Sequence, residues 1–258
     1  MAPRTITFTE TKAFQAFEGS IRSLKQHSQL TDCSLRVANT LINKSDAESI
    51  ASALCSSVQT HPQLNSPLSK TEVSRIFVAS RRKLNEHVIL ELYRIFSNYM
   101  RAIIGELMLA DPITLLKNVG ENKDNKIEFE RVILLGSYDG ILHYIADMVY
   151  RRLENERSTP KLVEKIINYT KIPVNAGLRD KALMYLEIRH LIIHNNSKAD
   201  DDFVERADGN IEVSKGTKLP INYHLVSDAI NSVQQFCKDF DSKLINGKLV
   251  RERFITSL

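Results

Sequence analysis

Glu187-Ile-Arg189-His190-Leu-Ile-Ile-His194-Asn195-Asn196 is a segment in which a helical apolar pattern and chemically active side chains coincide. Three consecutive branched aliphatic residues, Leu191 to Ile193, are typical of a buried helix rather than a solvated one. Arginine and histidine side chains inside such a helix must find partners or lose their charge. The segment therefore predicts a core helix that also carries the candidate functional site.

The spacing of the basic side chains restricts how they act together. His190 and His194 lie one turn apart on the same face of an ideal helix, whereas Arg189 and His194 diverge by about 140°. Three arrangements are open: the arginine side chain curls back, the helix ends near Asn195-Asn196, or a functional unit takes its parts from two copies of the chain. Asparagine is common just past a helix C-terminus, which favours an end at this point.

Outside this segment, the long apolar stretches also follow helical periodicity. The chain has only nine glycines and seven prolines, which disfavours the many tight turns of a sandwich or barrel. The pattern predicts an all-α fold with at most one small hairpin, near Ile211-Glu-Val213. The expected helices are 9–24, two between 30 and 58, one long bent helix or two helices between 69 and 109, then 128–156, 161–170, the motif helix, and 222–245.

Local signals mark the ends of several helices. Ser69-x-x-Glu72 is a capping box, Asp111-Pro112 ends the helix that follows it, and Thr159-Pro160 starts another. The segment from His61 to Pro67 has two prolines and is the predicted domain boundary. It separates an N-terminal helical extension, residues 1–68, from the main helical domain, residues 69–258. Gly120 to Lys126 is predicted to be a polar turn between helices.

Composition limits the class of protein. At 258 residues, 43% hydrophobic and 26% charged, the chain has the balance of a globular protein with a formal charge of +4. Cys33, Cys55 and Cys237 lack the spacing of a disulfide framework or a zinc site. The N-terminus has no apolar leader, and no run approaches the ~18 apolar residues of a membrane span. We expect a cytoplasmic protein that has no membrane partner.

The motif resembles the arginine-to-histidine signature of the HEPN superfamily of helical, mostly RNA-cleaving domains, in particular its RiboL-PSP and MAE-type branches. The resemblance covers roughly residues 80 to 246. The flanking residues that carry it are Leu162-Val-Glu-Lys-Ile-Ile-Asn168, Ile172-Pro173, Tyr185-Leu-Glu-Ile188, Asp202-Phe203 and Gly209-Asn-Ile-Glu-Val213. It implies a HEPN-like helical bundle and a homodimer whose two motifs face each other. It also implies a toxin or antiviral-defence effector with RNA as substrate and a neutralising antitoxin or defence-system partner.

The side chains of the motif suit cleavage of RNA by its own 2′-hydroxyl, without metal or cofactor. That reaction needs a base, an acid and a cation for the charge on the phosphorus oxygens. We expect Arg189, His194 and His190 to be catalytic, Asn195 and Asn196 to bind substrate, and the product to be a 2′,3′-cyclic phosphate. One His194 cannot be base and acid in the same step, but two copies across a dimer can.

Other interpretations of these residues are open. The basic side chains of the motif can simply satisfy one another in a scaffold, or His190 and His194 can bind a metal with Asp200 to Asp202 folding back. Asp139, His143 and Asp147 lie at four-residue steps on one helix face. They form an exposed polar stripe, bind a metal, or support the catalytic residues. A non-catalytic module that binds nucleotide, RNA or a protein is the alternative function.

Overall fold

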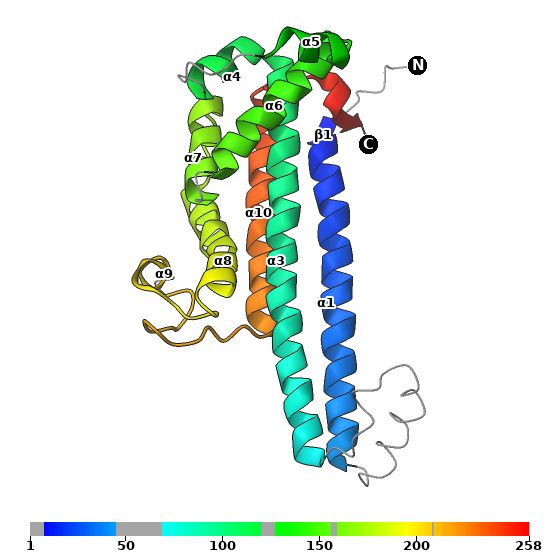
Figure 1. Ribbon diagram of the computed structural model, residues 1–258, viewed down its shortest axis with the longest axis vertical. Coiled ribbons are helices and arrows are strands. Elements are labelled where there is room, and N and C mark those ends of the chain that lie inside the picture. Colours follow the sequence, from blue (N-terminus) through cyan, green and yellow to red (C-terminus); the bar gives the residue numbers. More distant parts are fainter. Residues whose placement is uncertain (1–7, 45–68, 120–126, 156–158, 208, 258) are drawn as a thin grey trace, which may run out of the picture.

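Two long antiparallel helices form the spine of the molecule (Figure 1). The computed structural model describes residues 8–44, 69–119, 127–155, 159–207 and 209–257. α1 (Lys12–Lys44) packs along α3 (Lys70–Ala110), and the pair extends beyond the other helices at one end. At 1.5 Å per residue, α3 is about 60 Å long. The remaining elements are β1 (Phe8–Thr11), α4 (Pro112–Val119), α5 (Phe129–Leu135), α6 (Tyr138–Asn155), α7 (Thr159–Thr170), α8 (Ala176–His194), α9 (Asp201–Arg206), α10 (Tyr223–Asn246), η3 (Glu252–Phe254) and β2 (Ile255–Ser257).

The all-α prediction is confirmed, and several predicted helix ends are confirmed with it. The Ser69 hydroxyl accepts a hydrogen bond from the backbone N–H of Glu72, whose carboxylate accepts in return from the N–H of Ser69 at 2.8 Å. Asp111 caps the other end of α3 before Pro112. α7 begins at Thr159, as the Thr-Pro pair predicted.

α1 is one helix where the sequence predicted breaks. We expected one helix to end near Leu24 and two more between residues 30 and 58, but α1 continues unbroken to Lys44. The polar residue Asp32 is buried there and pairs with Arg36 at 2.6 Å and with Arg81 of α3 at 2.9 Å. A partner from α3 therefore stabilises a polar part of the helix. Residues 45–68, including the joint from His61 to Pro67, lie outside the described residues, as does the predicted turn from Gly120 to Lys126.

The predicted helix 128–156 is instead two helices, α5 and α6, bent by 120°. Gly136 lies between them with φ of 66°, a left-handed conformation that favours glycine. α5 has no buried residue, and Phe129 and Ile133 are 87% and 74% exposed. Among the described residues no single helix is long and apolar enough to cross a membrane. Taken together, α5 and α6 have sufficient length and apolar composition, but they are bent at the break between them.

The small two-stranded sheet joins the chain ends and does not lie at Ile211. β1 pairs antiparallel with β2, with Thr11 opposite Ile255. The hairpin predicted at Ile211-Glu-Val213 is wrong, because these residues form no strand and the connector after α9 bonds back to the residues that follow α8. The backbone N–H of Ala199 donates to the carbonyl of Thr217 and that of Leu219 donates to Ser197.

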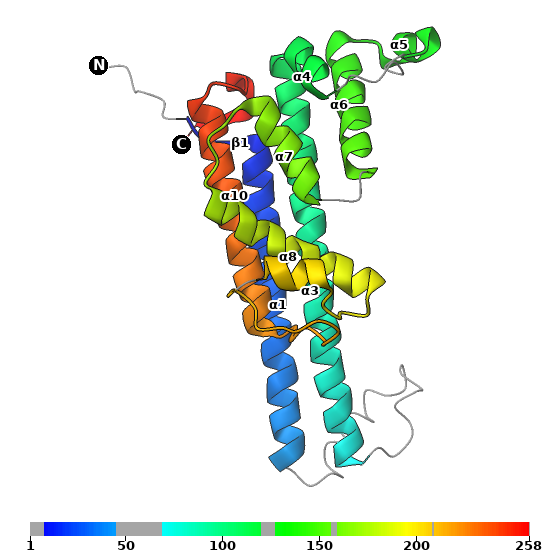
Figure 2. The ribbon, with the colours of Figure 1, turned by 90° about the vertical axis from the view of Figure 1, so that its left-hand side faces the viewer.

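α10 packs against α1, α3 and α8, and α8 crosses it, as Figure 2 shows. The helix predicted at 222–245 is thus α10, and it packs against the motif helix. Phe236 of α10 contacts the rings of Phe96 and Phe240, all three fully buried. α1 belongs to the same core, since Phe17 lies 5.2 Å from the ring of Tyr99. The domain boundary at residues 68 and 69 stays a prediction.

Candidate functional site

The candidate site occupies the last two turns of α8. Asn175 starts this helix by accepting a hydrogen bond from the backbone N–H of Leu178 at 3.2 Å. Asn195 caps its other end, and the next two residues, Asn196 and Ser197, have φ of 49° and 58°. The helix end predicted near Asn195-Asn196 is confirmed, so the motif histidines lie where the chain leaves the helix.

α8 is buried along most of its length but opens to solvent at the motif. Five consecutive residues from Ala182 to Leu186 are buried, as are Ile188 and Leu191. In the aliphatic run we expected to be buried throughout, Ile192 is half-buried and Ile193 is exposed. One face of the last turns therefore packs on the bundle, and the other is accessible.

The two histidines share the accessible face. Both are exposed, and their ring centroids lie 4.8 Å apart with planes inclined by 44°. This is the one-turn relation that the spacing predicted. Among the described residues neither histidine forms an ion pair, so the imidazoles are available to a molecule that approaches from solvent.

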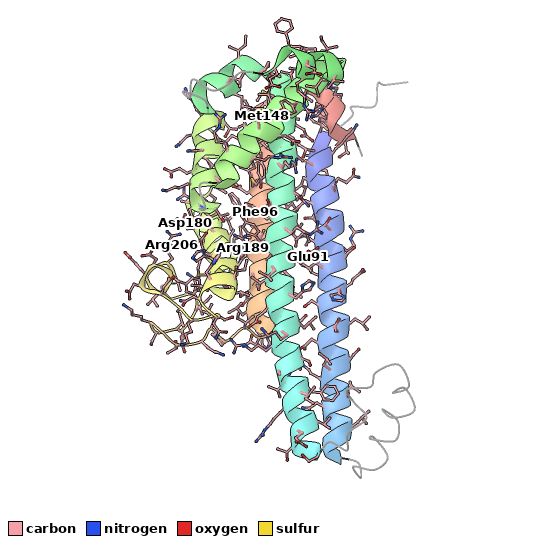
Figure 3. The ribbon with its side chains drawn as sticks, in the orientation of Figure 1. Glu91, Phe96, Met148, Asp180, Arg189 and Arg206 are labelled. Atoms are coloured by element: carbon pink, nitrogen blue, oxygen red, sulfur yellow. The ribbon has the colours of Figure 1, made fainter. Side chains whose placement is uncertain are left out.

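Arg189 points a different way. It is half-buried, and the central carbon of its guanidinium lies 4.5 Å from the ring centroid of Tyr93 in α3. Figure 3 shows Arg189 on α8 beside α3. Both residues, Arg189 and His194, belong to the regular helix α8, for which a separation of five positions corresponds to a divergence of about 140°. The contact with Tyr93 holds the Arg189 side chain against α3, whereas both histidines are exposed to solvent.

Glu187, at the start of the motif, lies among polar groups from three helices. Burial raises the pKa of its carboxyl, against the lowering effects of Arg206, of His190, of a hydrogen bond from Thr159 and of Arg189. Arg206 ends α9 and Thr159 begins α7. The inner flank of the motif helix is thus bound to its neighbours.

The two asparagines differ in their surroundings. The side-chain amide of Asn195 donates to the carbonyl of Lys198 at 2.8 Å, so it already holds the turn after the helix. Asn196 is exposed. Of the two predicted substrate ligands, Asn196 has the accessible side chain, and Asn195 has a structural hydrogen bond in addition to any contact with substrate.

A carboxylate of α3 anchors this turn. Glu86 is buried and accepts hydrogen bonds from the Ser197 hydroxyl at 3.1 Å, from Arg82 at 3.2 Å and from Lys83 at 2.8 Å. Burial alone would raise the pKa of Glu86, but these donors bring it below its ordinary value. Neither Glu86 nor Tyr93 was predicted from the sequence, because each looks like one more residue of a long core helix.

Four of the acidic residues considered as metal ligands form other contacts. Asp147 accepts two hydrogen bonds from Arg101, both at 2.8 Å, and Asp139 pairs with Arg253 at 2.9 Å. Asp200 caps α9, and Asp201 pairs with Lys215. In the part of the chain that the structure describes, no three histidine, cysteine or acidic residues form a group that could hold a metal ion.

Comparison of the chain with protein-family models, curated proteins and solved structures finds no match.

Proposed function

We propose that the protein is a metal-independent endoribonuclease of the HEPN type, active as a homodimer. The observation that carries this proposal is the accessibility of the motif: His190 and His194 are exposed, adjacent and outside any ion pair of the described residues. Histidines that served only to satisfy one another inside a scaffold would be buried. Accessible imidazoles next to an arginine instead suit a polar substrate with phosphates.

In this mechanism the RNA 2′-hydroxyl attacks the adjacent phosphorus and gives its proton to His194 of one chain. The partner's His194 donates a proton to the 5′-oxygen as the bond from phosphorus to that oxygen breaks. The products are a 2′,3′-cyclic phosphate and a 5′-hydroxyl. Arg189 stabilises the negative charge on the phosphorus oxygens. His190 orients His194 or contacts the phosphate, and Asn195 and Asn196 hold the substrate.

The geometry of α8 supports the proposed dimer. Arg189 and His194 diverge on their helix, so one chain presents an incomplete set of groups to a substrate. A two-fold axis that brings two motif helices together completes the set, because the same surface serves both partners. DNA has no 2′-hydroxyl, so selectivity for RNA follows from the nucleophile.

The test is incubation of the purified protein with end-labelled RNA in EDTA. Wild-type protein should cleave RNA, leave DNA of the same sequence intact and yield a cyclic phosphate. His194→Ala should lose about 10²- to 10⁴-fold in rate, as expected for loss of a general acid or base. His27→Ala, which removes an exposed histidine of α1, is the matched control and should cleave normally. Magnesium-dependent cleavage that leaves a 3′-hydroxyl would refute the mechanism.

The biological setting extends the same proposal by analogy with the HEPN family. It is that of a cytoplasmic toxin or antiviral-defence effector that is held inactive by an antitoxin or defence-system partner. Expression of the wild-type chain should then arrest bacterial growth, whereas expression of His194→Ala at the same level should not. Equal growth of the two cultures would contradict this role.

A non-catalytic interaction module is the second candidate, and exposed apolar residues on α1 favour it. Leu30, Val37 and Leu41 of α1 are 72%, 53% and 54% exposed. Single surface leucines are ordinary, but a row of them suits a protein partner. RNA binding by the wild-type protein without any cleavage, unchanged by His194→Ala, would support this candidate over the nuclease.

A further inference from the structure

We infer that Tyr93 is a positioning residue, which holds the guanidinium of Arg189 in place and leaves its hydrogen-bond donors free for a phosphate. The inference rests on the proposed function, since the phosphate is that of bound RNA. The contact joins two helices, with Tyr93 in α3 and Arg189 in α8, and the guanidinium carbon lies 4.5 Å from the ring centroid. At this distance the ring face attracts a cation.

Tyr93 is itself held firmly. It is half-buried and packs against the hydrophobic core, and its neighbour Leu92 is fully buried. The two helices α3 and α8 pack against each other. The ring is therefore part of the rigid body of the bundle, and an arginine that rests on it has fewer accessible rotamers than one in open solvent.

Other partly buried arginines of this protein are held differently. Arg81 donates to Asp32 at 2.9 Å, and Arg82 donates to Glu86 at 3.2 Å. A carboxylate partner occupies the donor fork of an arginine and cancels its charge. Such an arginine is poorly suited to bind an anion from solvent.

Arg189 forms no ion pair with an acidic side chain among the described residues. Glu187 is two residues away, on a different side of the helix, and accepts a hydrogen bond from Thr159. The Tyr93 ring restrains Arg189 through its face and takes none of its five N–H donors. The guanidinium is thus ordered and able to donate hydrogen bonds to a phosphate. Stabilisation of a pentacoordinate phosphorus requires a cationic group of this kind.

The test is a set of substitutions at Tyr93, assayed by RNA cleavage. Tyr93→Phe retains the ring and should cleave like the wild type. Tyr93→Leu keeps an apolar side chain but loses the ring face, and its kcat should fall about ten-fold with a smaller change in KM. Tyr144→Leu is the matched control, because Tyr144 holds Arg131 at 5.1 Å in the same manner and lies on α6. It should leave cleavage unchanged.

A double-mutant cycle shows whether Tyr93 acts through Arg189. In an Arg189→Ala background, Tyr93→Leu should cause no further loss, because the group that it positions is gone. Additive losses would overturn the inference, as would normal cleavage by Tyr93→Leu or a similar loss in Tyr144→Leu.

A side-chain NMR measurement separates this inference from the proposed function. The Nε–H resonance of Arg189 should show a ring-current shift in the wild type and in Tyr93→Phe that is lost in Tyr93→Leu. If the wild type does not cleave RNA but the resonance responds in this way, the nuclease proposal fails and the Tyr93–Arg189 contact stands. An Arg189 resonance that does not change in Tyr93→Leu overturns the positioning role, whatever the nuclease assay shows.

Discussion

Replacement of Glu106 by glutamine should stabilise the protein at alkaline pH and leave its stability almost unchanged near pH 4.5. Glu106 lies in α3, is 7% exposed and accepts a hydrogen bond from the backbone N–H of Ala13. Its Oε2 atom has no hydrogen-bond partner among the described residues. Burial, together with the negative charge of buried Asp241, raises the pKa of Glu106 from 4.5 to about 7. Asp241 is stabilised as an anion by hydrogen bonds from Thr11 and Tyr99.

The sign of the effect follows from the raised pKa. The folded chain binds the Glu106 proton more tightly than the unfolded chain does. The stability that this proton contributes is complete below the unfolded pKa of 4.5 and is lost as the pH rises through about 7. At about 1.4 kcal/mol for each pH unit between these values, the loss is about 3 kcal/mol. Glutamine keeps a hydrogen-bond acceptor for Ala13 and has no proton to lose.

The assay is urea unfolding followed by far-ultraviolet circular dichroism at pH 4.5 and pH 8.5. The free energy of unfolding of Glu106→Gln should exceed that of the wild type by about 3 kcal/mol at pH 8.5 and match it at pH 4.5. Glu212→Gln, which removes an exposed carboxylate, should show no such difference between the two pH values. Equal stability of Glu106→Gln and wild type at pH 8.5 would refute the reasoning.

Three further substitutions test the fold and the site. Gly136→Ala should destabilise the protein by about 1 kcal/mol in urea unfolding, because φ at this residue is 66°. Gly105→Ala should instead stabilise it by about 0.5–1 kcal/mol, since this glycine is inside α3 and a Cβ would lie 3.8 Å from Nδ1 of His143, an ordinary contact; destabilisation would show that α3 and α6 pack more closely there. Arg189→Lys should cleave RNA poorly, because a lysine has no planar donor fork, and full activity would show that charge alone suffices.

Local sequence signals predicted the features that depend on near neighbours in the chain. The capping box at Ser69, the start of α7 and the end of α8 at Asn195 each involve residues a few positions apart. The relation between His190 and His194 follows from one helical turn. The buried residues of α10 follow the apolar pattern that predicted this helix, including Phe236 and Phe240.

Features that depend on distant partners were missed. α1 continues past Leu30 because Arg81 of another helix pairs with Asp32. The sheet forms between the two ends of the chain, which no local pattern indicates. The contact between Tyr93 and Arg189 joins residues of separate helices, and nothing in the periodicity of α3 distinguishes Tyr93 from its neighbours. The break at Gly136 had a local signal, but a glycine inside an apolar pattern is compatible with a continuous helix as well.

The composite dimer site is tested most directly by mixing two inactive variants. Arg189→Ala chains and His194→Ala chains should each cleave RNA poorly on their own. A mixed dimer retains one intact arginine and one intact histidine, a combination that neither parent dimer has, but it lacks the second histidine that the wild-type dimer uses. Unfolding and refolding the two variants together should therefore yield a metal-independent cleavage rate that differs from the mean rate of the two parents treated alone in the same way. A mixture that cleaves at the mean rate of its two parents, or a wild-type enzyme that is fully active as a monomer, would contradict the dimeric site.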